Sequence, residues 1–344
     1  MNTRTRIAAI AATVLSAALV LTGCAAGEGS ALDAAAPDSG KWSADTLNID
    51  FATYNPLSLI IKKEGWIEKA LGDDVKVNWI QSAGSNKANE ALRAGAIDVG
   101  STAGSAALLA RSNGSPIKAI DIYSQPNWAA IAVPKGSEIT DVAGLKGKSI
   151  AATKGTDPYF FLLQSLATAN LSLSDVDVQN LQHADGKTAL ESGAVDAWSG
   201  LDPLLSTSVA TAGSKIIYDN IDFNSYGFLN ATESFLAKSP DLAQVVVNAY
   251  EKARAYAIAN PDDAAAVLAD VAAIDPAIAT AVLTDRTNFD IDPVPGQKQL
   301  DVLKIIGPIF VESGDVASQD LIDTALSSLF ETTYATNADP SKIG

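Results

Sequence analysis

Short apolar stretches alternate along the chain with segments of helical character, and small polar turns separate them. Residues 91–109 show this pattern most compactly: Gly95 suits the end of a helix, and residues 96–100 form an apolar stretch of strand length. A hydroxyl-rich turn follows, at Ser101, Thr102, Gly104 and Ser105. In open α/β sheets such strand ends face the ligand crevice, and a following helix start attracts anions. We therefore predict an α/β fold with a binding site at its strand ends.

The same pattern recurs later in the chain. Residues 189–205, ALESGAVDAWSGLDPLL, align without a gap with ALRAGAIDVGSTAGSAA, which begins at Ala91. The alignment matches Gly193 with Gly95 and Asp196 with Asp98. An internal repeat of this kind predicts two similar lobes, although short αβ units can also resemble one another through shared constraints.

Further strands and helices follow from the same periodicities. Strands are expected at residues 46–52, 75–80, 117–123, 129–133, 149–152 and 215–218. Asn55 and Pro56 fit the cap and first turn of a helix. Prolines also precede or begin three Ala-rich helices, expected at residues 240–259, 261–271 and 276–283.

The amino-terminal segment reads as an export signal. Arg4 and Arg6 precede an apolar run over residues 7–21 that is too short for a comfortable membrane span. The small residues before Cys24 resemble the lipobox of bacterial lipoproteins. That resemblance implies a signal peptide at 1–23, cleavage before Cys24 and a diacylglycerol on its thiol; an ordinary secretory signal with a chance cysteine is the alternative. Residues 24–45, rich in Gly, Ser, Ala, Asp and Pro, predict a disordered tether.

Composition narrows the classes of partner. The formal net charge is −16, and it becomes −18 once Arg4 and Arg6 are removed, which argues against a nucleic-acid partner and against electrostatic attachment to anionic lipid. Cys24 is the only cysteine, so the mature fold has no disulfide and no thiolate metal site. About 320 residues remain after Cys24, enough for two domains with their own cores.

Neutral side chains at the strand ends are the first candidates for the binding site. Hydroxyls that could hold an oxyanion beside backbone N–H groups are Ser82, Ser85, Ser101, Thr102 and Thr156, each of which also fits a helix cap. The Tyr54 side chain either forms a wall of the ligand site or packs at its rim. Aromatic side chains that could wall the cavity, or pack the lobes instead, are Trp128, Trp198 and Tyr226.

Three ionisable residues complete the candidate set. Asp202 either caps the next helix or contacts an amino group, which would indicate a zwitterionic ligand. Arg286, one of four arginines after Cys24, either binds the ligand through two N–H groups of its guanidinium or is a charge on the surface. A Ser-His-Asp system or a histidine metal site would need His183, the only histidine. Because Gly-rich phosphate loops are absent as well, we expect neither an enzyme nor a cofactor.

A set of motifs gives a more specific resemblance. D-x-x-x-L-K-G-K at 141–148, K-G-T at 154–156, G-A-V-D-A-W at 193–198 and D-P at 202–203 resemble the solute-binding proteins of nitrate, sulfonate and taurine uptake. The similarity covers residues 46–333 and is greatest to the aliphatic sulfonate-binding proteins. It implies a type II periplasmic-binding-protein fold, in which two α/β lobes joined by two crossover strands close over a small molecule. Residues 46–125 and 226–340 would form lobe I, and 126–225 lobe II.

The resemblance also implies a function. It indicates a monomeric solute-binding component of an ABC importer, lipid-anchored through Cys24 on the outer face of the bacterial cytoplasmic membrane. It would capture a small organic anion, an alkanesulfonate or taurine, and deliver it to an ABC permease. In members of this family, the region that corresponds to His183 lines the ligand cleft. Similar proteins also carry an arginine in an R-x-x-F sequence like that of Arg286. The alternatives are a binder of a nitrate-like anion or a pyrimidine or thiamine-precursor heterocycle, a pyrimidine-related enzyme, or a ligand-sensing lobe.

Overall fold

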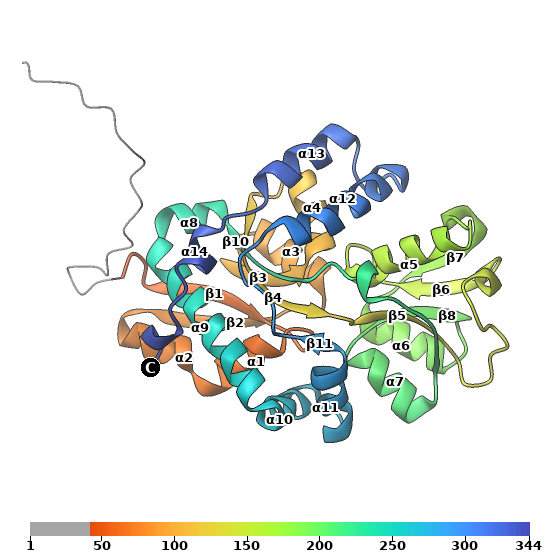
Figure 1. Ribbon diagram of the computed structural model, residues 1–344, viewed down its shortest axis with the longest axis horizontal. Coiled ribbons are helices and arrows are strands. Elements are labelled where there is room, and N and C mark those ends of the chain that lie inside the picture. The colour runs from red at the N-terminus through yellow and green to blue at the C-terminus, as the bar shows by residue number, and fades with distance from the viewer. Residues whose placement is uncertain (1–41) are drawn as a thin grey trace, which may run out of the picture. The chain divides into compact units, whose positions relative to one another are not determined.

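Two β-sheets organise the part of the chain that the computed structural model describes, residues 42–344 (Figure 1). The six-stranded sheet contains β1 (Thr46–Phe51), β2 (Lys76–Gln81), β3 (Val99–Ala103), β4 (Ile117–Pro126), β10 (Gly227–Thr232) and β11 (Thr287–Asn288). The five-stranded sheet contains β5 (Ala129–Val133), β6 (Ser149–Ala152), β7 (Asp177–Asn180), β8 (Ala197–Leu201) and β9 (Lys215–Asp219). The chain passes to the second sheet between β4 and β5 and returns between β9 and β10.

The two sheets share one topology. Their strand orders are β2-β1-β3-β10-β4, with β11 added beyond β4, and β7-β6-β8-β5-β9. The first three strands of each order pair in parallel, and the fourth, β10 or β5, is antiparallel to both of its neighbours. In each sheet this antiparallel strand is the one that the chain enters after crossing from the other sheet. The predicted two-fold repeat is therefore confirmed in the topology.

The repeat also holds at the level of single contacts. The Asp98 carboxylate accepts a hydrogen bond from the backbone N–H of Asn48 at 2.8 Å, and its own N–H donates to the Asn48 carbonyl at 2.7 Å. Asp196 makes the same two bonds with Ser149, both at 2.9 Å. Each aspartate thus joins the start of a central strand to the segment that leads into the neighbouring parallel strand.

Helices cover both sheets. Those around the six-stranded sheet are α1 (Pro56–Glu64), α2 (Trp66–Leu71), α3 (Ser85–Arg93), α4 (Gly104–Ser112), α8 (Glu233–Lys238), α9 (Pro240–Ala259), α10 (Pro261–Ala272), α11 (Pro276–Asp285), α12 (Gln297–Glu312), α13 (Gln319–Ser328) and α14 (Thr333–Thr336). Those around the five-stranded sheet are α5 (Asp157–Thr168), α6 (His183–Glu191) and α7 (Leu204–Ala212). Short 3₁₀ turns are η1 (Gly72–Asp74), η2 (Ala143–Leu145), η3 (Leu173–Asp175), η4 (Ile221–Phe223) and η5 (Pro340–Lys342).

Local sequence explains where several helices begin. The Asn55 side chain accepts from the N–H of Ser58, and Pro56 occupies the first turn of α1, as predicted. Prolines begin α9, α10 and α11 as well, so the three Ala-rich helices are confirmed to within two residues at each end. No helix within residues 42–344 combines the length and the apolar character that a membrane span requires.

The structure corrects two of the sequence-based boundaries. The strand expected at 96–100 is β3, which runs from Val99 to Ala103, so Ser101 and Thr102 lie inside a fully buried strand and not in a turn. The predicted tether is wrong for its last residues. Trp42 packs on the core and donates its indole N–H to the Leu71 carbonyl at 3.0 Å, which holds this segment in place. The predicted signal peptide (1–23), Cys24 and the rest of the tether lie outside the described residues.

Candidate functional site

The strand ends of the two sheets meet at the starts of α3 and α6. Gly84 directly precedes α3, and His183 is the first residue of α6. A Cβ placed on Gly84 would lie 3.0 Å from His183 Nε2 and 2.9 Å from Asn86 Oδ1. Only a glycine at position 84 therefore allows this approach. The two helix starts, one from each sheet, form the centre of the candidate ligand site.

His183 is held as a neutral acceptor. Its side chain is buried, and Nδ1 lies 3.2 Å from Thr153 Oγ1, which donates its own proton to the Leu181 carbonyl at 2.6 Å. Thr153 therefore accepts from His183 Nδ1–H, and Nε2 keeps a free lone pair. Burial lowers the pKa of His183 to about 4, so the ring is uncharged at neutral pH.

Two further acceptor atoms also lack partners, one close to His183 Nε2 and one on the preceding residue. Asn86 Oδ1, Gln182 Oε1 and His183 Nε2 are all buried without a hydrogen bond among residues 42–344. Buried polar atoms are normally paired, so this cluster suits a bound group that donates N–H or O–H bonds. The first turn of α3 adds backbone N–H groups that no helix bond uses, and these favour an anionic group.

The hydroxyls predicted to hold an anion are used within the protein. Ser101 donates its backbone N–H to the Asp50 carboxylate at 2.9 Å and its hydroxyl at 3.2 Å, and Ser82 hydrogen-bonds to the same carboxylate. The remaining three hydroxyls make internal bonds too: Ser85 Oγ accepts from Ala103 N at 2.9 Å, Thr102 Oγ1 donates to Ala103 O at 2.8 Å, and Thr156 Oγ1 donates to Thr153 O at 2.6 Å. Ser85 differs from the other four, because its hydroxyl only accepts in these bonds and keeps an O–H that could donate to an anion beside the backbone N–H groups of α3.

Asp50 is a buried acid beside the candidate hydroxyls that the sequence analysis missed. It lies in β1 and is fully buried, and desolvation raises its pKa to about 7. In a strand whose apolar and polar residues alternate, an acidic residue is normally predicted to face solvent. Its serine partners come from β3 and from the turn after β2, and no local pattern links them.

Tyr54 and Trp128 form one aromatic unit between the sheets. The Tyr54 hydroxyl donates to the Ser101 carbonyl at 2.9 Å, and its ring meets the Trp128 ring edge to face, with centroids 6.1 Å apart. Both side chains are buried. Burial raises the pKa of Tyr54 well above its usual value, so the hydroxyl stays protonated.

Asp157, also missed, joins four separate segments. Its Oδ1 accepts from the hydroxyls of Ser105 at 2.6 Å and Ser225 at 2.5 Å, and its Oδ2 accepts from Ser225 N at 2.9 Å and Trp128 Nε1 at 2.8 Å. Ser105 lies in the first turn of α4, Trp128 on the crossing into the second sheet, and Ser225 on the return. In the sequence, Asp157 followed by Pro158 indicates only the start of a helix.

Asp202 and Arg286 bind one another. Asp202 Oδ1 accepts from Ser206 N at 2.9 Å and from its hydroxyl at 2.6 Å, so the helix-cap interpretation is confirmed. Asp202 Oδ2 accepts from Arg286 Nε at 2.5 Å, and Arg286 Nη1 donates to Asp219 at 3.1 Å. The surface-charge interpretation of Arg286 is thus wrong. Because a guanidinium already neutralises Asp202, this carboxylate is a poor partner for a ligand amino group.

The other two aromatic candidates differ in position. Trp198 is fully buried in a core cluster of the five-stranded sheet, and a Cβ on Gly186 would lie 2.7 Å from its Nε1. The prediction that Trp198 walls the cavity is therefore wrong, because it packs β8 against α6. Tyr226 lies on the return crossing with φ of 64°, and its carbonyl accepts from the N–H of Gly104 at 3.1 Å.

Two α/β units of matching topology, with facing strand ends, define the periplasmic-binding-protein fold. The chain belongs to the NMT1/THI5 like family, whose model matches residues 61–264. It is 30% identical over 236 residues to an aliphatic sulfonates-binding protein of Bacillus subtilis (strain 168), covering 67% of this chain and 70% of that protein. It is 28% identical over 254 residues to the protein of the same name in Escherichia coli (strain K12), covering 73% and 79%.

A solved structure agrees on the fold. The alkanesulfonate-binding protein SsuA from Xanthomonas axonopodis pv. citri, bound to MOPS, superposes with a TM-score of 0.74 at 23% identity, covering 82% of this chain and 98% of that one. Both curated relatives and this solved structure are named as binding proteins, and none of the three is named as an enzyme.

Proposed function

We propose that the protein is the extracytoplasmic solute-binding component of an ABC importer and that it captures a small organic sulfonate between two lobes. Lobe I would comprise residues 46–125 and 226–340, and lobe II residues 126–225. The strand content of the two sheets supports this division. The names of the two curated relatives support the ligand class.

The observation that carries this proposal is the cluster of unpaired acceptors at the meeting of the two helix starts. Leaving a buried polar atom unpaired costs about 1–3 kcal/mol, so the observed arrangement of the two helix starts is unfavourable without a ligand. A ligand that donates to His183 Nε2 and Asn86 Oδ1 removes this cost and shifts the population toward the closed state. Closure of the two lobes is therefore coupled to ligand binding.

The same cluster favours an aminosulfonate such as taurine over a plain alkanesulfonate. The ammonium group supplies donors to the acceptors of His183, Asn86 and Gln182, while the sulfonate lies at the first turn of α3. Asp202, which the sequence suggested for the amino group, is occupied by Arg286.

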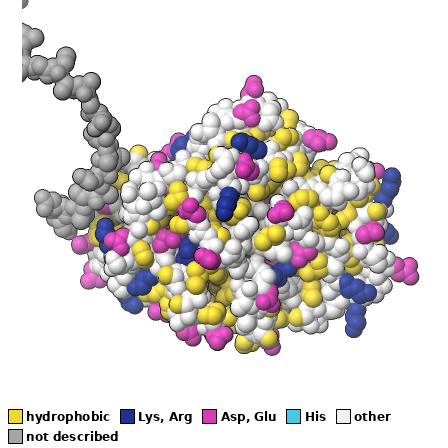
Figure 2. Space-filling view, viewed as in Figure 1, with side chains coloured by type: hydrophobic (Ala, Val, Ile, Leu, Met, Phe, Trp, Pro, Cys, Tyr) yellow, Lys and Arg dark blue, Asp and Glu magenta, His cyan; other side chains and the backbone are white. Residues whose placement is uncertain are grey.

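Location and partners complete the proposal. The export signal and Cys24 would place the protein, lipid-anchored and monomeric, on the outer face of the cytoplasmic membrane, where it delivers its ligand to an ABC permease. The acidic surface supports attachment through the acyl chain over attachment through charge. On the face drawn in Figure 2, acidic side chains are scattered widely and the Lys and Arg side chains lie singly or in small groups.

Calorimetry with taurine, propanesulfonate and nitrate tests the ligand. We expect taurine to bind more tightly than propanesulfonate, and His183→Ala to reduce taurine affinity about tenfold while changing propanesulfonate affinity less. Asp185→Asn, an exposed site on the same helix, is the matched control. Equal losses for both sulfonates in His183→Ala would refute the aminosulfonate assignment, and no binding of any sulfonate would refute the ligand class.

A further inference from the structure

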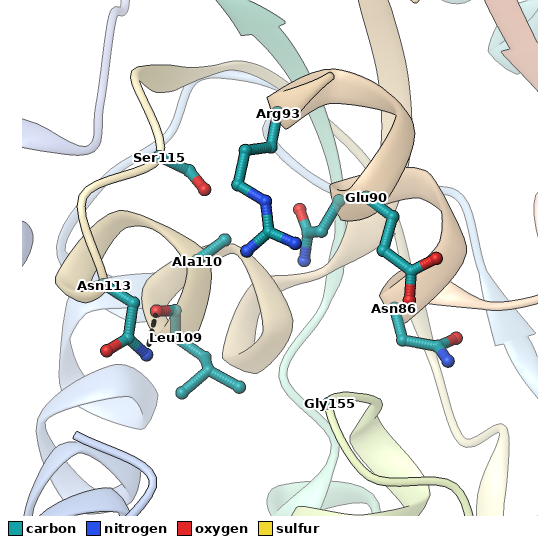
Figure 3. A pocket seen from close by; sticks show the side chains of 9 residues that line it. Asn86, Glu90, Arg93, Leu109, Ala110, Asn113, Ser115 and Gly155 are labelled. Carbon is teal, nitrogen blue, oxygen red and sulfur yellow. Dashed lines mark hydrogen bonds between the residues drawn. The ribbon is translucent and has the colours of Figure 1, made fainter. Parts of the chain in front are cut away.

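A cavity lies beside α3 and α4, next to the facing helix starts. Its volume is about 180 Å³, and it opens to solvent. It is lined by residues of α3, α4 and the loop that follows α4, with Gly155 from the turn before α5 (Figure 3). A Cβ on Gly155 would lie 3.5 Å from the Cβ of Asn86, so the two sheet units meet at this end as well. Of the residues given a binding role above, only Asn86 lines this cavity.

Arg93 supplies the charge of this cavity. In Figure 3 its guanidinium points away from the α3 backbone toward Ala110 on α4. The other arginines of residues 42–344 all form ion pairs, Arg111 with Glu233, Arg254 with Asp121 and Glu251, and Arg286 with Asp202 and Asp219, whereas Arg93 forms none within this part of the chain. Glu90, one turn away, pairs with Lys87 at 2.8 Å.

Helix electrostatics alone do not explain the position of Arg93. A cation in the last turn of α3 interacts favourably with the carbonyl end of the helix dipole, but this effect does not direct the side chain of Arg93, which is exposed to solvent and also lines the cavity. In a chain of net charge −16, an unpaired guanidinium facing a cavity attracts a small anion.

The other polar groups of the cavity define which anion fits. The Ser115 hydroxyl lies on the wall across from Arg93 and can donate a second hydrogen bond (Figure 3). Asn89 Oδ1 is buried and accepts no hydrogen bond within residues 42–344, and the Glu90 carboxylate stands at the rim. An oxyanion bound here thus meets two donors and at least one acceptor. Sulfate offers nothing to the acceptor, whereas a phosphate group that retains a proton donates its P–OH to it.

We propose that this cavity is a second anion site that takes a hydrogen phosphate group, either free or as a small phosphomonoester. Arg93 and Ser115 bind the charged oxygens, and Asn89 Oδ1 accepts from the P–OH. Leu109 and Ala110 form the apolar wall, which leaves room for a small organic group on the phosphate. The site is independent of the sulfonate assignment, because it shares only the edge residue Asn86 with the central site.

NMR of the Arg93 Nε–Hε signal at pH 7 tests the proposal, with phosphate, methyl phosphate, sulfate and chloride titrated at constant ionic strength. We expect a saturable shift with phosphate that is at least several times weaker with sulfate. The comparison of phosphate with methyl phosphate identifies the source of the group. Ala110→Leu, which fills the cavity while leaving Arg93 in place, should abolish the saturable shift.

Calorimetry of phosphate binding gives a second readout. Arg93→Gln should abolish the phosphate heat, and Lys63→Gln should retain it, since Lys63 is an exposed cation in the last turn of α1 and serves as the matched control. A shift that grows linearly without saturation, an equal response to sulfate, or full retention in Ala110→Leu would each overturn the assignment.

Discussion

Arg286 Nε donates to Asp202 Oδ2 over 2.5 Å and thereby ties the segment before β11 to the segment before α7. The first belongs to the six-stranded sheet and the second to the five-stranded sheet. The Arg286 side chain is 15% exposed and that of Asp202 4%, so solvent screens this pair only weakly. The ion pair therefore holds the two sheet units together in the observed arrangement.

We predict that Asp202→Asn lowers the free energy of unfolding by about 2 kcal/mol, because it leaves a shielded guanidinium with only Asp219 as a charged partner. The asparagine keeps Oδ1 as an acceptor for Ser206, so the cap of α7 is retained and the change isolates the ion pair. Urea unfolding followed by circular dichroism measures the loss. Asp74→Asn, an exposed acid, is the control, and equal effects of the two variants would contradict the prediction.

We expect a larger loss from Asp157→Asn. This carboxylate accepts four hydrogen bonds in a fully buried position, and an amide nitrogen in place of one oxygen would face donors. The expected cost is about 3 kcal/mol by urea unfolding. Ser105→Ala removes a single donor and should cost about 1 kcal/mol. If the two variants lost the same amount, Asp157 would not act as the junction of the four segments.

The sequence could predict local features of the fold, but not the contacts of Asp157. Periodicity located most strands and the proline-initiated helices, because those signals lie within a few residues of one another. The repeat around Asp98 and Asp196 predicted two units of matching topology. The role of Asp157 depends on Ser105 and Ser225, which are far apart in the chain, so no local signal could reveal it.

The hydroxyls illustrate the opposite error. Ser101 and Thr102 have the composition of an anion-binding turn, but β3 extends through them, and tertiary pairing with β10 decides their conformation. Asp50 then takes the hydrogen bonds that the sequence assigned to a ligand. The approach of Gly84 to His183 depends on how the two sheet units dock, and that geometry has no counterpart in a linear pattern.

The free energy of unfolding should decrease as pH rises, because the buried Asp50 carboxyl ionises. Its pKa is about 7 in the folded protein and 3.8 in the unfolded chain, so between these values the folded state binds more protons, and the stabilisation is lost as pH rises from about 4 to 7. His183 acts in the opposite sense, since its folded pKa of about 4 lies below 6.5 and its contribution is lost as pH falls through that window.

Variants separate the two contributions. Asp50→Asn keeps an acceptor for Ser101 and removes the ionisation, so its stability relative to the wild type should be greater at pH 8 than at pH 5. His183→Gln should show its greatest relative gain at pH 5. Urea unfolding at both pH values measures the differences. An Asp50→Asn difference that does not change with pH would contradict a buried carboxyl that titrates near neutrality.

The packing of Trp198 makes Gly186 a sensitive position. A glycine in a helix interior usually gains about 0.5–1 kcal/mol of stability when replaced by alanine. Here the added Cβ would lie 2.7 Å from Trp198 Nε1 and 2.9 Å from its Cδ1, in a fully buried cluster. We therefore predict that Gly186→Ala reverses the usual sign and destabilises the protein by about 2 kcal/mol, since either the indole or α6 must shift.

A double-mutant cycle identifies the cause of that loss. Trp198→Leu removes the ring atoms that the new methyl group would meet, so Gly186→Ala should cost much less in this background than in the wild type. Gly136→Ala is the control, because a Cβ there meets nothing within 4 Å. Additive effects of Gly186→Ala and Trp198→Leu in urea unfolding would show that the cost arises elsewhere. Non-additive effects would instead show that the Trp198 ring fits because Gly186 has no side chain, and not because β8 and α6 lie farther apart. Trp198 aligns with Gly100 in the internal repeat, so the first unit has no ring to accommodate at this position.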